Sequence, residues 1–152
     1  MIAAIRQFFA DLAGKDEPRR FTDDDFRLAA AALLFHAIGI DGVVSADERR
    51  RLAALLQTRF GLSAEETEEL MEAAEAADRE AVDLYGFTSV LKRRLDEAER
   101  ERVIAMMWEV AYADGAVHEF EDNLIWRAAE LLAVPARARI RLKQAARDNA
   151  TE

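Results

Sequence analysis

The chain has 152 residues, of which 51% are hydrophobic, and this is enough apolar material for the core of one folded domain. Its net charge of −9 at pH 7 argues against a nucleic-acid-binding protein, because such proteins neutralise phosphates with Lys and Arg. The chain has no cysteine, which excludes disulfides, thiolate metal sites and cysteine nucleophiles. With no signal peptide or membrane-length apolar run, this composition predicts a cytoplasmic protein.

The first predicted element is an amphipathic helix over residues 1–13. Its apolar positions recur at helical spacing: Ile2, Ile5, Phe8, Phe9 and Leu12. A polar break containing Pro18 follows, so we predict an N-terminal helix and linker over residues 1–20 and a helical domain over residues 21–152. The apolar face of the helix has three possible destinations: the chain's own core, a protein partner, or peripheral contact with a membrane surface.

Capping signals divide the rest of the chain into further helices. Thr22 is predicted to cap a nearly all-apolar, central helix that ends at Gly39. Three capping-box patterns open later helices: Ser45-x-x-Glu48, Ser63-x-x-Glu66 and Asp96-x-x-Glu99. Helices over residues 84–95 and 118–132, and a last one from Pro135, complete the set. The absence of any period-two strand pattern predicts an all-α fold, a single compact domain of about seven to eight helices.

An acidic turn occurs twice in the chain. Asp41-Gly42-Val43-Val44-Ser45-Ala46-Asp47-Glu48 returns as Asp114-Gly115-Ala116-Val117-His118-Glu119-Phe120-Glu121, at an offset of 114 − 41 = 73 residues. The similarity extends beyond the turn, because Phe35 aligns with Trp108 and Leu52 with Ile125. We therefore expect a duplicated unit of helix, turn, helix, loop and helix, packed around a pseudo-twofold axis that brings the two turns together.

Two interpretations of the turns remain open on this evidence. In the first, the glycines end helices and the acids cap the helices that follow, so that duplication alone explains the pattern. In the second, the acids bind a hard divalent cation such as Ca²⁺, Mg²⁺ or Mn²⁺. The ligand set would be Asp41, Glu48, Asp114 and Glu121, with Asp47, His118 and Asp122 further out.

The pattern also matches the last eight residues of an EF-hand loop, in which an Asp precedes the turn Gly and a Glu closes the loop. The first two ligand positions of that loop fall on Ala37 and Gly39 in one copy, and on Val110 and Tyr112 in the other. Each turn therefore supplies half a coordination sphere, and a shared site needs both. His118 is a poor helix cap, yet Glu121 still follows it three residues later, which suggests a second task for that acid.

Other chemistry finds no support in the sequence. The segment from His118 to Asp122 lacks the second histidine of a zincin helix. Neither histidine accompanies a nucleophile elbow, and no Gly-rich phosphate loop is present, so we expect no enzyme activity. His36 lies in an apolar helix and is interpreted as a satisfied core residue.

The paired segments Ile40 to Glu48 and Ala113 to Glu121 resemble the signatures of the TerB, or tellurite resistance protein B, family, over about residues 22–146. The resemblance implies an all-α domain with internal pseudo-twofold symmetry in a bacterial, cytoplasmic protein linked to tellurite resistance and stress responses. It also implies metal binding at acids that match Asp41, Glu48, Asp114 and Glu121. Our first hypothesis is a non-enzymatic cation-binding domain that serves a stress-response assembly with an unknown protein partner. The alternative is a metal-free interaction module that uses its acidic surface.

Overall fold

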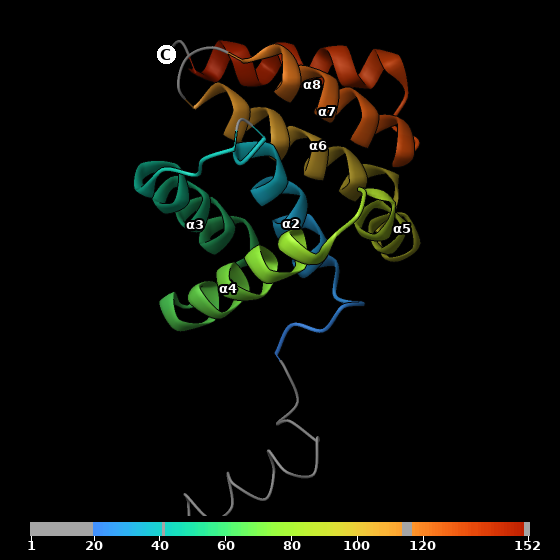
Figure 1. Ribbon diagram of the computed structural model, residues 1–152. Coiled ribbons are helices and arrows are strands. Elements are labelled where there is room, and N and C mark those ends of the chain that lie inside the picture. Colours follow the sequence, from blue (N-terminus) through green and yellow to red (C-terminus); the bar gives the residue numbers. More distant parts are fainter. Residues whose placement is uncertain (1–19, 41, 114–116, 151–152) are drawn as a thin grey trace, which may run out of the picture.

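The computed structural model describes residues 20–40, 42–113 and 117–150 (Figure 1). The predicted helix over residues 1–13, and the turn residues Asp41 and Asp114, lie outside these ranges. The described residues form seven helices and no strand: α2 Phe26–Ile38, α3 Ala46–Phe60, α4 Ala64–Glu80, α5 Tyr85–Arg94, α6 Glu97–Tyr112, α7 Glu119–Leu131 and α8 Ala136–Ala150. The predicted all-α fold is confirmed. None of the helices in these ranges combines the length and the apolarity needed to cross a membrane.

Helix α2 is the centre of the domain. It packs against α3, α4, α5, α6 and α7, and ten of its thirteen residues are buried. A helix that is apolar on all sides must be surrounded by other helices, because leaving any of its apolar faces in water costs free energy. Figure 1 shows α2 with α4 below it and the α6, α7 and α8 layers above it. The sequence therefore predicted the position of α2 correctly.

The start of α2 differs from the prediction. The cap is Asp25 and not Thr22, because the Asp25 carboxylate accepts the backbone N–H of Arg27 at 2.9 Å and the Arg27 guanidinium at 2.7 Å. Burial raises the pKa of the Asp25 carboxyl, but the hydrogen bonds and the charge of Arg27 together hold that pKa below its ordinary value. Three consecutive aspartates follow Thr22, and Asp25 caps the helix because it is the one that pairs with Arg27.

The predicted repeat is present in the structure. The unit α2, α3 and α4 corresponds to α6, α7 and α8, and α5 connects the two units. All three predicted capping boxes form, at Ser45, Ser63 and Asp96. The loops after α3 and α7 also match. The N–H of Leu62 donates to the Gln57 carbonyl at 3.0 Å, and the N–H of Val134 donates to the Ala129 carbonyl at 2.9 Å.

These two matching loops differ in one residue that the backbone conformation penalises. Gly61 has φ of 62° and Ala133, its counterpart, has φ of 58°. A left-handed backbone costs a residue with a Cβ roughly 1–2 kcal/mol, whereas glycine adopts it freely. We expect Ala133→Gly to raise the free energy of unfolding by about 1 kcal/mol and the matched change Gly61→Ala to lower it by about 1 kcal/mol, both measured by urea denaturation. The two variants must change the free energy of unfolding in opposite directions, and a loss of stability in Ala133→Gly would contradict this interpretation of the loop.

Candidate functional site

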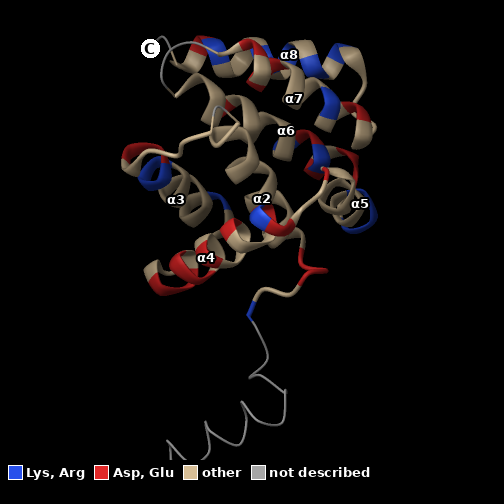
Figure 2. Cartoon of the chain, viewed as in Figure 1, with Lys and Arg blue, Asp and Glu red and all other residues tan. Residues whose placement is uncertain are grey.

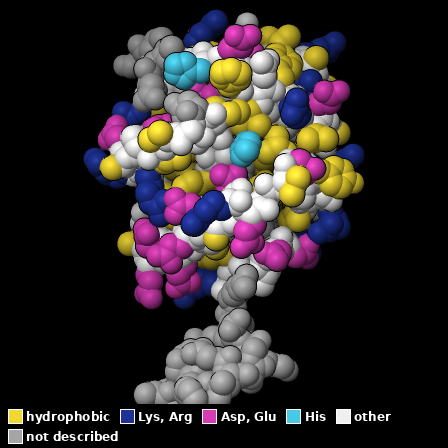
Figure 3. Space-filling model, in the orientation of Figure 1, with side chains coloured by type: hydrophobic (Ala, Val, Ile, Leu, Met, Phe, Trp, Pro, Cys, Tyr) yellow, Lys and Arg dark blue, Asp and Glu magenta, His cyan; other side chains and the backbone are white. Residues whose placement is uncertain are grey.

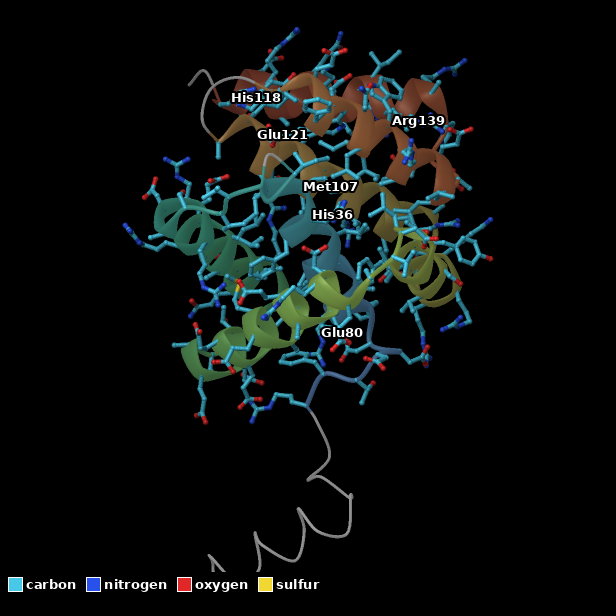
Figure 4. All side chains as sticks on the ribbon, in the orientation of Figure 1. His36, Glu80, Met107, His118, Glu121 and Arg139 are labelled. Carbon is cyan, nitrogen blue, oxygen red and sulfur yellow. The ribbon has the colours of Figure 1, made fainter. Side chains whose placement is uncertain are left out.

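A pocket of about 440 Å³ lies where the two repeats meet. It is bounded by the last turns of α2 and α6 and by the first turns of α3 and α7, which are the helices that flank the two acidic turns. Figure 4 labels His118 and Glu121 at the start of α7, on this side of the molecule. The described residues that line the pocket are Ala37, Ile38, Ile40, Glu48, Arg51, Leu52, Leu55, Glu109, Val110, Ala113, His118, Phe120 and Glu121.

The lining of the pocket reflects the internal symmetry. Three pairs of residues that occupy equivalent places in the two repeats, at the offset of 73, line it together: Ala37 with Val110, Ile40 with Ala113, and Glu48 with Glu121. A cavity that receives equivalent positions from both halves lies between the two repeats. The prediction that duplication brings the flanks of the two turns together is therefore supported by the described residues.

Glu48 and Glu121 hold the same structural position in α3 and α7. Glu48 accepts the backbone N–H of Ser45 at 3.1 Å, and Glu121 accepts the backbone N–H of His118 at 3.3 Å. Each bond uses one of the two carboxylate oxygens. Both side chains are half-buried, so each acid is fixed at the pocket wall by the start of its own helix.

The bond to His118 removes one argument drawn from the sequence. Glu121 has kept its capping task although His118 replaced the Ser of the first copy, because the donor is a backbone N–H that every residue other than proline supplies. Its presence three residues after a poor cap is therefore explained by local structure alone. What points to a further task is instead that Glu121 lines the same pocket as Glu48.

The pocket also contains charged side chains that the sequence did not single out. Glu109 receives the Arg59 guanidinium at 2.6 and 2.8 Å on its two oxygens. Arg51 extends to the pocket and pairs with Asp47 at 2.8 Å. Arg59 and Glu109 are 50 residues apart in the chain, so no local pattern could have predicted their pairing.

Asp47 and Asp122, the proposed outer members of the site, are engaged elsewhere. Asp47 pairs with Arg51 and with Arg50, at 2.8 and 3.5 Å. Asp122 accepts the Lys143 ammonium at 2.6 Å, between α7 and α8. Neither is among the residues that line the pocket. His118 does line it, as the cap residue of α7.

The chemistry of the pocket wall fits a hard cation. Carboxylate oxygens are the ligands that Ca²⁺, Mg²⁺ and Mn²⁺ prefer, and two of the four predicted acids line one pocket from opposite repeats. Asp41 directly follows Ile40, and Asp114 directly follows Ala113, both of which line the pocket. Within the described residues alone, no group of three or more His, Asp or Glu side chains is placed to hold a metal ion. Glu48 and Glu121 would therefore need the turn aspartates to complete a ligand set.

His36 is satisfied, as predicted, but it is not a core residue. Its Nδ1 lies 2.9 Å from an Asp78 oxygen, and the side chain is 43% exposed. It pairs with Asp78 of α4 and lines a second cavity instead of the acidic pocket. It is thus an ion-pairing residue near the surface and takes no part in the candidate site.

Comparison with known proteins gives one result. The family model described as tellurite resistance protein TerB matches residues 27–144, which is most of the chain. The match spans both repeats and all seven described helices up to the last turns of α8. Neither the curated proteins nor the solved structures give a match.

Proposed function

Because the chain belongs to the TerB family, we propose that it is a non-enzymatic domain that binds one divalent cation, such as Ca²⁺, Mg²⁺ or Mn²⁺, in the pocket between its two repeats. Glu48 and Glu121 would contribute carboxylate oxygens from α3 and α7. Asp41 and Asp114 would contribute the remaining carboxylates. The proposed role belongs to a cytoplasmic stress response related to tellurite or metal resistance, in which the cation-loaded domain serves a protein partner.

The observation that carries this proposal is the pairing of equivalent acids in one cavity. Glu48 and Glu121 line the same pocket, and like charges brought close together repel each other. A divalent cation would replace this repulsion by attraction to both carboxylates. The half-buried position of both side chains strengthens the effect, since partly buried charges are screened less by salt than exposed ones.

We expect a weak site. Sites with few protein carboxylates and open access bind calcium with dissociation constants of about 0.1–1 mM. Arg51 at the pocket wall adds positive charge and lowers the affinity further, whereas the Arg59–Glu109 ion pair is neutral as a whole. The affinity therefore suits a domain that responds to a large change in cation concentration.

Isothermal titration of the full chain with CaCl₂, MgCl₂ and MnCl₂ tests the proposal. We expect saturable binding of one ion, and a loss of affinity of at least about tenfold when Glu48→Gln and Glu121→Gln are combined, because both negative charges are removed while Gln still accepts the cap N–H. Binding that is unchanged in the double variant would contradict the proposal, as would the absence of binding at millimolar cation.

Glu66→Gln is the matched control. Glu66 stands at the same position of the capping box of α4, where it accepts the Ser63 N–H at 2.9 Å, but it does not line the pocket. It therefore removes a carboxylate from a helix start without touching the proposed site. We expect wild-type affinity in this variant, which separates a local effect at the pocket from a general effect of net charge.

A metal-free interaction module is the second candidate function. Helix α4 carries eight acidic residues and one arginine, and Figure 2 shows the red acidic positions of this helix at the end of the molecule opposite α8. A basic partner would be attracted to this face, and the attraction would weaken with salt. Binding of a lysine-rich peptide in EDTA, lost on Glu65→Gln with Glu72→Gln and unaffected by Glu48→Gln with Glu121→Gln, would favour this function over the first.

A further inference from the structure

A second cavity, of about 570 Å³, adjoins the acidic pocket and is of a different character. It lies between the start of α5, the segment that precedes α5, and the outer face of α7; we call it the α5–α7 groove. Ile40 and Phe120 line both cavities, so the two lie side by side. Figure 3 shows hydrophobic side chains gathered over the middle of this face.

The apolar surface of the described residues is concentrated in this groove. Among the large hydrophobic side chains that are exposed, three line it: Val82 at 99%, Tyr85 at 67% and Phe120 at 68% exposure. Scattered exposed hydrophobics need no explanation, but a contiguous apolar patch with a polar rim marks a surface that another element covers. The rim here consists of Asp83 and Arg127, one charge of each sign.

The chain itself contains a segment of matching chemistry outside the described residues. Residues 1–13 place their large apolar side chains at helical spacing, and their two charged side chains are Arg6 and Asp11. One positive and one negative charge are thus available for Asp83 and Arg127 at the rim. The apolar side chains include Phe8 and Phe9, which suit a groove lined by Tyr85 and Phe120.

The length of the connecting chain permits this contact. Phe21 is buried and the Arg27 guanidinium lies 4.6 Å from its ring centre, so the chain is anchored at the start of α2. The groove contains His36 and Ile40, at the end of α2. The thirteen residues of α2 span about 20 Å, and the seven residues from 14 to 20 extend at most about 23–25 Å.

We propose that the α5–α7 groove binds the apolar face of residues 1–13 of the same chain, as an amphipathic helix. Because the linker can reach the groove, this contact needs no encounter between two molecules, which favours the same chain over a second copy at low protein concentrations. The segment then covers the exposed side chains of Val82, Tyr85 and Phe120.

Paramagnetic NMR on the full chain tests this assignment. The chain has no cysteine, so Asn123→Cys, at the groove, accepts a single nitroxide label. We expect the amide signals of residues 2–12 to lose at least half of their intensity, and to regain it when the label is reduced. The control label at Gln144→Cys, on the exposed side of α8, should leave these signals unchanged. In the labelled Asn123→Cys protein, Phe8→Asp with Phe9→Asp should restore the signals.

Three results would overturn the proposal. One is unchanged intensity of residues 2–12 with the label at Asn123→Cys. Another is signal loss that appears only in a mixture of two samples, one with the nitroxide but no ¹⁵N and the other with ¹⁵N but no nitroxide. That result would assign the groove to a second copy. The third is an effect of anionic lipid vesicles on residues 2–12 with no effect of the label, which would assign the segment to a membrane surface.

Discussion

Replacing Trp108 by alanine is expected to lower the free energy of unfolding by about 3–5 kcal/mol, because it empties the largest fully buried side-chain volume of the domain. The Trp108 ring lies in α6, packs against Tyr112 at a centroid distance of 6.1 Å, and is covered by the Lys143 ammonium at 5.1 Å from its centre. Urea denaturation followed by circular dichroism measures the effect without relying on tryptophan fluorescence.

Two further variants make this prediction specific. Trp108→Phe should cost less than half as much, because it keeps most of the ring and removes Nε1, a buried donor without a partner in the described structure. Trp126→Ala, at a half-buried position of α7, should also cost less than Trp108→Ala. An alanine variant of Trp108 that loses less than about 1 kcal/mol would show that the two repeats do not share one tightly packed core.

Replacing Ala31 by leucine is expected to lower the free energy of unfolding by about 1–3 kcal/mol, through overpacking. Ala30, Ala31 and Ala32 have no exposed surface in the middle of α2, where five other helices surround it. Small side chains at these positions allow the helices to approach closely, and three added carbon atoms must displace a neighbour.

The matched control for this change is Ala76→Leu, at an exposed position of α4. Alanine and leucine have similar helix propensities, so we expect the control to stay within about 0.5 kcal/mol of wild type. Thermal unfolding of both variants compares them directly. Equal effects at the two positions would mean that α2 is not the packed centre of the domain.

Most of the fold was predictable because its signals are local. Each capping box pairs residues three apart, and Ser45, Ser63 and Asp96 open helices as predicted. The duplication is visible as a constant offset, and the all-apolar composition of α2 identified it as the central helix. The wrong helix start at Thr22 arose where several caps competed within four residues and the Arg27 side chain decided in favour of Asp25.

The candidate site was predictable only in part. Symmetry reasoning indicated that Glu48 and Glu121 belong together, and they line one pocket. Neither the Arg59–Glu109 pair nor the place of Arg51 at the pocket wall could be predicted, since contacts between distant residues leave no periodic pattern. The prediction of a second task for Glu121 from its poor cap residue was also wrong in its reasoning, because the cap bond of Glu121 requires only the backbone N–H of His118. The contributions of Asp41 and Asp114, outside the described residues, stay predictions.

The most direct test of the cation proposal is a calcium titration of the ¹⁵N-labelled full chain, followed by amide chemical shifts. We expect saturable shifts concentrated at the two helix starts, Ser45–Glu48 and His118–Glu121, with little change in α4, and we expect these shifts to be lost when Glu48→Gln and Glu121→Gln are combined. Shifts confined to the acidic face of α4, or no shifts at millimolar calcium, would contradict it.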